Sequence, residues 1–133
     1  MKVFIDASVI LAALGSVTGG SSEILKLIKK GIVVGITSGA VLEEVLRNSG
    51  KIKVFEGEVI KFISGSSLQV LPAPASEDVE KYFSDVAGKD AHIVVAAINC
   101  GADIVITLDK KHLLPVKIRG LNILTQGEFL KNL

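Results

Sequence analysis

The sequence predicts an α/β protein, a three-layer α/β/α sandwich around a mainly parallel sheet of roughly five strands. Two observations lead to this prediction. Short apolar runs, typical of strands buried on both faces, alternate along the chain with segments whose apolar residues recur at helical spacing. The length of 133 residues suits one core, so residues 1–133 are predicted to form a single domain.

The first half of the chain is predicted to contain two strands and four helices. In order, these are a strand at 2–5, a helix at 7–14, a helix capped by Ser21 or Ser22, a strand at 32–36, a helix capped by Ser38, and a helix carrying Phe55, Val59, Phe62 and Ile63. Serine favours helix N-termini because its hydroxyl accepts a free backbone N–H. Gly15 and Gly31 are natural helix ends.

The second half is predicted to supply three strands and three helices. In order, these are a strand at 68–71, a helix from Ser76 with Val79, Tyr82, Phe83 and Val86 on one face, an apolar helix from about Asp90 to Gly101, a strand at 104–108, a strand at 121–124, and a short last helix. Pro72 and Pro74 stop the first of these strands, because proline cannot continue a ladder. Thr125 and Glu128 have capping-box spacing.

The charge balance leaves room for a nucleic-acid partner. Lys and Arg number 15 against 14 Asp and Glu, so the chain as a whole is nearly neutral. If four of the acids are gathered in one site, 15 basic residues face 10 remaining acids over the rest of the surface. A basic rim around an acidic cleft suits a phosphate backbone.

Other features bear on where the protein works. The longest apolar region, 91–108, is interrupted by polar residues, so no membrane span is expected. The N-terminus enters a strand directly, and we expect no signal peptide. Cys100 stands alone, which fits a reducing compartment, and the protein is expected in the cytoplasm.

Several catalytic motifs are missing from the sequence. It has no C-x-x-C, no H-E-x-x-H and no P-loop. Only His92 and His112 offer imidazole groups. His92, on an apolar helix, is expected to have a hydrogen-bonded structural role, whereas His112, beside two lysines, is the better candidate for touching phosphate. A metal site made from this chain would be oxygen-rich, which suits Mg²⁺ or Mn²⁺.

Two aspartates directly follow or end apolar strands. Asp6 comes after the strand at 2–5, and Asp109 ends the run from Ile104 to Leu108. Both would lie at the carboxyl ends of buried strands, where parallel α/β sheets bind their ligands. With Glu44 and Asp90, they form a set of four acids predicted to hold a divalent metal.

Each of these acids also has a structural alternative. Asp6 can be the N-cap of the helix that follows it, and Asp90 can cap the helix at 91–100. Asp109 can be a turn residue. Glu43 and Glu44 lie about equally far from the centre of their helix's apolar stripe, so periodicity does not choose between them. Capping and metal binding are compatible uses of one carboxylate.

Four segments resemble the PIN domain of metal-dependent, VapC-like ribonucleases. Residues 3–10, with Asp6, are similar to that family's opening strand and first aspartate. Residues 37–46 resemble the segment that bears its glutamate. Residues 90–93 and 101–109 resemble its two C-terminal acidic motifs. The four occur in the family's order and cover essentially the whole chain.

The resemblance implies a site and its supporting residues. It assigns the catalytic and metal-binding roles to Asp6, Glu44, Asp90 and Asp109, with the hydroxyls of Ser8 and Thr107 in support. Glu44 is preferred to Glu43 on family register alone. Ala7 departs from the pattern, because the family commonly has a hydroxyl residue there. The resemblance also implies that the first and fourth strands are neighbours.

The implied activity is endonucleolytic hydrolysis of RNA with one or two Mg²⁺ or Mn²⁺ ions. Many members are toxins of toxin–antitoxin pairs, so an antitoxin-like protein is an expected partner. The mean hydropathy of +0.53 favours a homodimer as well. Two alternatives stay open. One is a PIN-like module that binds RNA or protein without cutting, and the other is a metal-dependent phosphatase or receiver domain.

Overall fold

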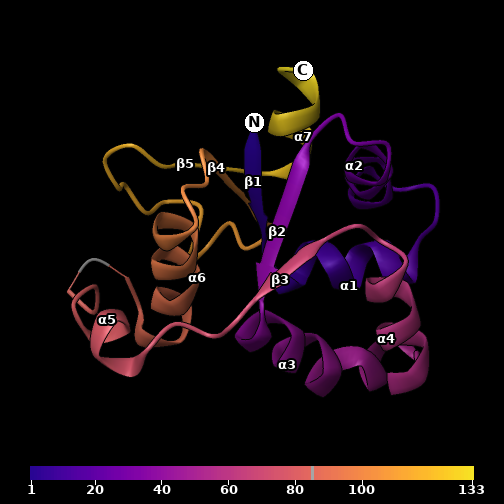
Figure 1. Cartoon of the computed structure of the whole chain (residues 1–133), viewed down its shortest axis with the longest axis horizontal. Coiled ribbons are helices and arrows are strands. Elements are labelled where there is room, and N and C mark those ends of the chain that lie inside the picture. The colour runs from indigo at the N-terminus through magenta and orange to yellow at the C-terminus, as the bar shows by residue number, and fades with distance from the viewer. Residues whose placement is uncertain (85) are drawn as a thin grey trace.

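A five-stranded parallel sheet forms the centre of the computed structural model, which describes residues 1–84 and 86–133 (Figure 1). The strands are β1 (Lys2–Ile5), β2 (Val34–Ser38), β3 (Gln69–Leu71), β4 (Ile104–Ile106) and β5 (Asn122–Leu124). Their order in the sheet is β3-β2-β1-β4-β5, and each neighbouring pair is parallel. The predicted fold class and the adjacency of the first and fourth strands are confirmed.

The strand order reverses between β1 and β4. Val3 pairs with Ile104 and Ile5 with Ile106, so the two strands end at the same level. The backbone N–H of Asp6 continues the ladder by donating to the carbonyl of Ile106 at 3.1 Å. The crevice beyond this reversal is where open parallel sheets bind ligands. Asp6 therefore lies directly beyond the end of β1, on the side of the sheet where such a crevice is expected.

Helices cover both faces of the sheet. They are α1 (Ala7–Gly15), α2 (Gly20–Lys29), α3 (Gly39–Asn48), α4 (Glu56–Ser64), α5 (Ser76–Glu80), α6 (Gly88–Asn99) and α7 (Gln126–Lys131), with a 3₁₀ turn at Ser49–Ile52. In Figure 1, α1 to α4 lie on one side of the sheet, and α5 and α6 on the other. The connections after β1 and β2 therefore run over one face, and the connection after β3 crosses to the other.

The core is made by the strands and the inner faces of the helices. Phe4, Ile10 and Ile93 are among its largest fully buried side chains. Gly35 in β2 allows α2 to approach closely, because a Cβ atom there would lie 2.4 Å from Cδ1 of Ile28. Any larger residue at position 35 would force the side chain of Ile28, or α2 itself, to shift.

Two predictions around α2 are wrong, and each has a local cause. Ser21 and Ser22 lie inside the helix, whose N-cap is Gly19. Their hydroxyls instead bond to Gln126 and to the carbonyls at the end of α1, which ties three helices together. The second strand begins at Val34, not at residue 32, because the N–H of Ile32 still bonds to a carbonyl of α2.

Three predicted helices also differ in detail. Helix α5 stops at Glu80, because Tyr82 and Phe83 bond three residues back and the chain tightens into turns. Gly88 begins α6 instead of preceding it, with Ala87 as N-cap. Phe55 is the N-cap of α4 and is 79% exposed, so it does not share the buried face of that helix. The strands at 68–71, 104–108 and 121–124 are shorter than predicted.

Among the described residues, no single helix is long and apolar enough to cross a membrane. Helices α1 and α2 meet such a criterion only when they are counted together, and they are bent by 102° relative to each other.

Candidate metal centre

Asp6 is fixed at the junction of β1 and α1. It is 7% exposed and is the N-cap of α1, with Oδ1 accepting the N–H of Ala7 at 2.8 Å. Its other oxygen, Oδ2, accepts the hydroxyl of Ser8 at 2.9 Å and that of Thr107 at 2.7 Å. The capping alternative is therefore correct for Asp6. These three hydrogen bonds fix the position of the carboxylate beyond the end of β1.

Ser8 and Thr107 connect the end of β1 to the end of β4. The Ser8 hydroxyl also accepts the backbone N–H of Leu108 at 3.0 Å. The Thr107 hydroxyl accepts the N–H of Asp109, again at 3.0 Å. Each hydroxyl donates to Asp6 and accepts from the chain after β4, so the two chain ends hold each other in register.

Asp109 begins the turn that follows β4. Its Oδ1 accepts the backbone N–H of Lys111 at 3.2 Å and that of His112 at 2.9 Å. The turn alternative is therefore correct for Asp109. The turn also brings the His112 ring back, with Nδ1 3.5 Å from Oδ1 of Asp109. The spacing Asp109-x-x-His112 is the sequence signal for this contact, and sequence reasoning passed over it.

Asp90 approaches the crevice from the first turn of α6. Ala87 is the N-cap, so the capping alternative for Asp90 is wrong. Its Oδ2 atom is buried and has no hydrogen-bond partner among the described residues. Burial raises the pKa of Asp90, and the charges of Asp109 and Asp6 raise it further, while Lys89 opposes them. Lys89 is thus near enough to oppose this rise, but no ion pair of Asp90 is formed among the described residues.

Glu44 faces the same cluster from α3. It is half-buried, whereas Glu43 is exposed. Burial raises the pKa of Glu44, and Asp6 and Asp90 raise it further. The rotation of α3, which buries Val41 and Val45, directs Glu44 toward the crevice and Glu43 toward solvent. Tertiary packing thus separates two residues that periodicity left equivalent.

His92 lies one turn beyond the start of α6. It was expected to have a hydrogen-bonded structural role, and one of its two ring nitrogens does not meet that expectation. Its Nδ1 is buried without a hydrogen-bond partner among the described residues. Burial lowers the pKa of His92, although the nearby charges of Asp6 and Asp90 act in the opposite direction. The charges of these two aspartates thus reach the His92 ring.

The residues come together to different degrees. One ligand atom from each of Asp90, Asp109 and His112 lies within 4.8 Å of the other two. Asp6 and Glu44 do not belong to that group, but they interact with it electrostatically. The charge of Asp6 raises the pKa of Asp90, and the charge of Asp90 raises the pKa of Glu44. The buried, unpartnered oxygen of Asp90 and the oxygen-rich donor set fit a hard divalent cation.

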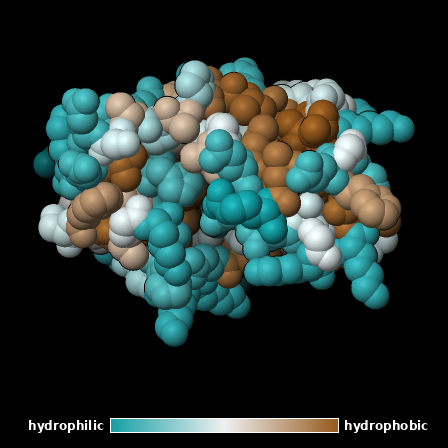
Figure 2. All heavy atoms as spheres, turned by 90° about the horizontal axis from the view of Figure 1, so that it is seen from below, coloured by the Kyte–Doolittle hydropathy of each residue, from teal (hydrophilic) through white to brown (hydrophobic). Residues whose placement is uncertain are grey.

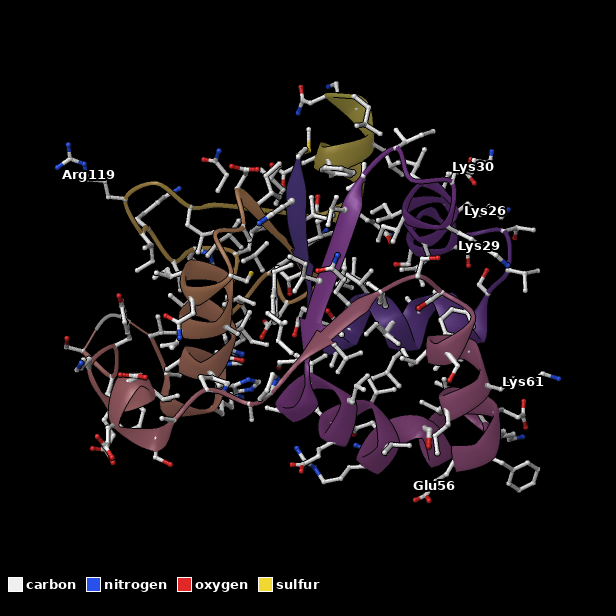
Figure 3. The ribbon with its side chains drawn as sticks, viewed as in Figure 1. Lys26, Lys29, Lys30, Glu56, Lys61 and Arg119 are labelled. Carbon is white, nitrogen blue, oxygen red and sulfur yellow. The ribbon has the colours of Figure 1, made fainter. Side chains whose placement is uncertain are left out.

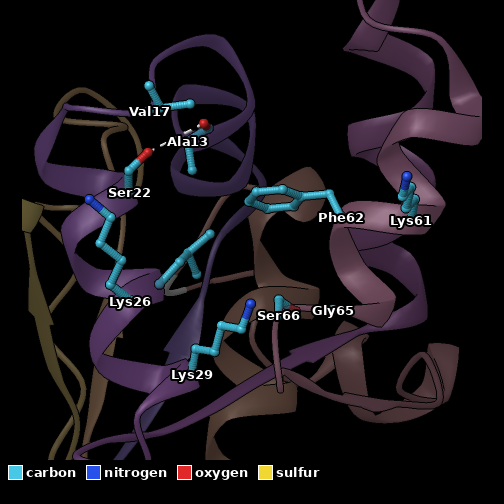
Figure 4. Close-up of a pocket in the computed structure, with 10 residues that line it drawn as sticks. Ala13, Val17, Ser22, Lys26, Lys29, Lys61, Phe62, Gly65 and Ser66 are labelled. Carbon is cyan, nitrogen blue, oxygen red and sulfur yellow. Dashed lines mark hydrogen bonds between the residues drawn. The ribbon is translucent and has the colours of Figure 1, made fainter.

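A separate hollow of about 330 Å³ lies between α1, α2 and α4 (Figure 4). It is lined by Ala13, Val17, Ser22, Leu25, Lys26, Lys29, Lys61, Phe62, Gly65 and Ser66, and so includes none of the acids described above. Figure 4 shows Phe62 reaching from α4 toward the corner between α1 and α2. Figure 3 shows Lys26 and Lys29 on α2, and Lys61 on α4.

Residues 2–111 match the model of the PIN domain family. Among solved structures, the chain resembles VapBC2 from Rickettsia felis bound to a DNA fragment from their promoter, with a TM-score of 0.70, 18% identity, and coverage of 94% of this chain and 98% of that one. It also resembles VapC20 of Mycobacterium tuberculosis, a toxin that cleaves the Sarcin-Ricin loop, with a TM-score of 0.61, 19% identity, and coverage of 82% and 91%. The comparison with curated proteins found no match.

Proposed function

This chain belongs to the PIN domain family, and from that premise we propose that it is an Mg²⁺- or Mn²⁺-dependent endoribonuclease. The observation that carries the proposal is the buried Oδ2 of Asp90, which has no partner among the described residues and faces the charges of Asp109 and Asp6. An atom in that position is costly unless a cation satisfies it. We assign the binding of that cation to Asp6, Glu44, Asp90 and Asp109.

In the proposed mechanism, water attacks phosphorus and the bond to the 3′-oxygen breaks, which gives products with a 5′-phosphate and a 3′-hydroxyl. When bound, the metal supplies electrophilic stabilisation of the phosphate and lowers the pKa of water. Ser8 and Thr107 hold Asp6 and the start of the Asp109 turn in position. No side chain is required as a covalent nucleophile.

Basic residues near the cluster support an RNA substrate. Lys89 counteracts the rise in the pKa of both Glu44 and Asp90, and Arg47 does so for Glu44, so both cations lie close to the acids. Lys110 and Lys111 follow Asp109 directly and are exposed. These positive charges can hold backbone phosphates on either side of a scissile bond.

The proposal is tested by incubating the purified protein with RNA, DNA and a chromogenic phosphate ester, each with Mn²⁺ or EDTA. A metal-dependent endoribonuclease cleaves RNA in Mn²⁺ and not in EDTA, and leaves the ester intact. Binding without cleavage would support the inactive PIN-like module instead. Hydrolysis of the ester alone would support the phosphatase alternative.

The two adjacent glutamates provide a matched pair of variants. Glu44→Gln is expected to reduce RNA cleavage by more than roughly tenfold, because it removes a charge that faces the cluster. Glu43→Gln, one position away on the exposed side of α3, is expected to cleave like the wild type. Initial rates at saturating Mn²⁺ measure both. Equal losses, or a loss for Glu43→Gln alone, would contradict the assignment of Glu44.

We also propose an antitoxin-like protein partner, placed in the hollow between α1, α2 and α4. Its lining includes the apolar residues Val17, Leu25 and Phe62 together with the lysines Lys26, Lys29 and Lys61. Lys26 forms an exposed pair with Glu23 at 3.8 Å, so Lys29 and Lys61 supply the charge for a partner. A lining of apolar and basic residues suits an amphipathic segment with acidic residues. We further propose that residues 1–133 form one domain and that the protein acts in the cytoplasm.

A homodimer is proposed through the apolar surface of α3 and α4. Leu42, Leu46, Val59, Ile60 and Ile63 line a shallow hollow of about 230 Å³ there, and Ile60 is 58% exposed. Figure 2 shows apolar side chains gathered over the half of the surface where α3 and α4 lie. The other four residues are buried or half-buried, so the hollow offers an apolar lining with Ile60 exposed beside it. Apolar surface gathered in this way marks association sites.

Ile60→Lys is expected to convert this dimer to a monomer at micromolar concentration, because it places an ammonium group in the apolar contact. Sedimentation velocity over a concentration series measures the change. Val70→Lys, on the edge strand β3 and away from this surface, is the control. A wild-type protein that stays monomeric at every concentration would contradict the proposed homodimer.

A further inference from the structure

His112 occupies an unusual place beside the two aspartates. One ligand atom each of Asp90, Asp109 and His112 lies within 4.8 Å of the others, which is close enough for all three to reach one cation. Asp90 comes from the first turn of α6, whereas the other two come from the turn after β4. Three residues from two separate elements therefore point at one position.

The turn after β4 fixes the ring in that place. Oδ1 of Asp109 accepts the backbone N–H of His112 at 2.9 Å, and this bond determines where the Cα of His112 lies. The ring then folds back until Nδ1 is 3.5 Å from the same carboxylate oxygen. The side chain of His112 is 40% exposed, so the position remains open to solvent and to substrate.

A nitrogen donor changes which cation the site prefers. Carboxylates alone suit Mg²⁺, which demands oxygen ligands and keeps much of its water. Imidazole adds affinity for Mn²⁺ and the later first-row ions, and much less for Mg²⁺. The expectation from sequence was an oxygen-rich site of four carboxylates. The observed trio has two oxygen donors and one nitrogen donor.

We infer that His112 is a metal-binding residue, which makes this centre selective for Mn²⁺ and related transition cations over Mg²⁺. The inference rests on the proposed function, because it places the cation at the same carboxylates. The alternative is a purely structural role, in which the Nδ1 atom facing Asp109 carries a hydrogen that bonds to the carboxylate and so offers no lone pair to a metal.

Calorimetric titration of the purified, metal-free protein with Mn²⁺ and with Mg²⁺ tests the inference. His112→Ala is expected to weaken Mn²⁺ binding roughly 10- to 100-fold and to change Mg²⁺ binding by less than about threefold. Lys111→Ala, the adjacent residue in the same turn, is the control and should preserve the preference for Mn²⁺. Equal losses for both ions in His112→Ala would overturn the inference.

A spectroscopic measurement identifies the donor atom itself. Electron spin-echo modulation of the Mn²⁺ complex is expected to show a directly bound ¹⁴N nucleus in the wild type and to lose it in His112→Ala. If Asp90→Asn abolishes Mn²⁺ binding but the wild type shows no nitrogen, the carboxylate centre stands and His112 is not a ligand. If the wild type binds neither ion, the proposed metal centre itself fails.

Discussion

Replacing Asp90 by asparagine is expected to abolish RNA cleavage, with a loss of more than roughly 100-fold, while the circular dichroism spectrum stays unchanged. Asparagine keeps the shape of the side chain but removes the charge at the one buried carboxylate oxygen that has no protein partner among the described residues. The cation then loses a ligand that nothing else nearby replaces. Cleavage rates at saturating Mn²⁺, with and without EDTA, measure the effect.

Asp90 is a better test position than Asp6. Both oxygens of Asp6 are engaged in hydrogen bonds, so its substitution would also disturb the junction of β1 and α1. The matched control is Asp78→Asn, because Asp78 lies in the first turn of α5 and pairs with Lys81 at 3.5 Å on the surface. Cleavage by Asp90→Asn at the wild-type rate would contradict the proposed site.

Glu44→Gln is expected to melt above the wild type in EDTA at neutral pH, by roughly 2–6 °C. Burial and the charges of Asp6 and Asp90 raise the pKa of Glu44 in the folded protein. The folded state then binds more protons than the unfolded state between the two pKa values. Stability is therefore lost as pH rises through this window and is regained as pH falls through the raised folded pKa.

The charge of Glu44 also determines how the difference in melting temperature between Glu44→Gln and the wild type depends on pH and on metal. The advantage of Glu44→Gln should disappear toward about pH 4, near the ordinary pKa of glutamate, because the wild-type carboxyl is then protonated in both states. Saturating Mn²⁺ should reverse the order, since a ligand at 100 times its Kd stabilises the wild type by about 2.7 kcal/mol and the variant binds it more weakly.

Thermal melts in EDTA and in Mn²⁺ between pH 4 and 8 measure both effects. Glu43→Gln is the control, because its side chain is exposed and it should follow the wild type throughout. If Glu44→Gln melts at or below the wild type in EDTA, the attraction of Arg47 and Lys89 for Glu44 outweighs its burial and repulsion. The acidic cluster would then carry no excess charge for a cation to relieve.

Sequence by itself determined the class of fold and the positions of two candidate site residues. Apolar runs and helical periodicity are local properties, and they were sufficient to predict a mainly parallel sheet of roughly five strands with helices on both faces. The same local reasoning placed Asp6 and Asp109 at strand ends. Parallel strands necessarily bring those ends to one edge of the sheet.

Only the tertiary structure decided how the remaining side chains face the crevice. Periodicity could not distinguish Glu43 from Glu44, and the choice came from the packing of α3 on the core. The capping alternative for Asp90 was removed by the start of α6 at Gly88. His112 reached the aspartates through a turn whose shape depends on the bonds to Oδ1 of Asp109. Such contacts depend on the rotation of whole elements and on how a loop folds back. Spacing along the chain, even the i, i+3 spacing of Asp109 and His112, does not by itself fix either one.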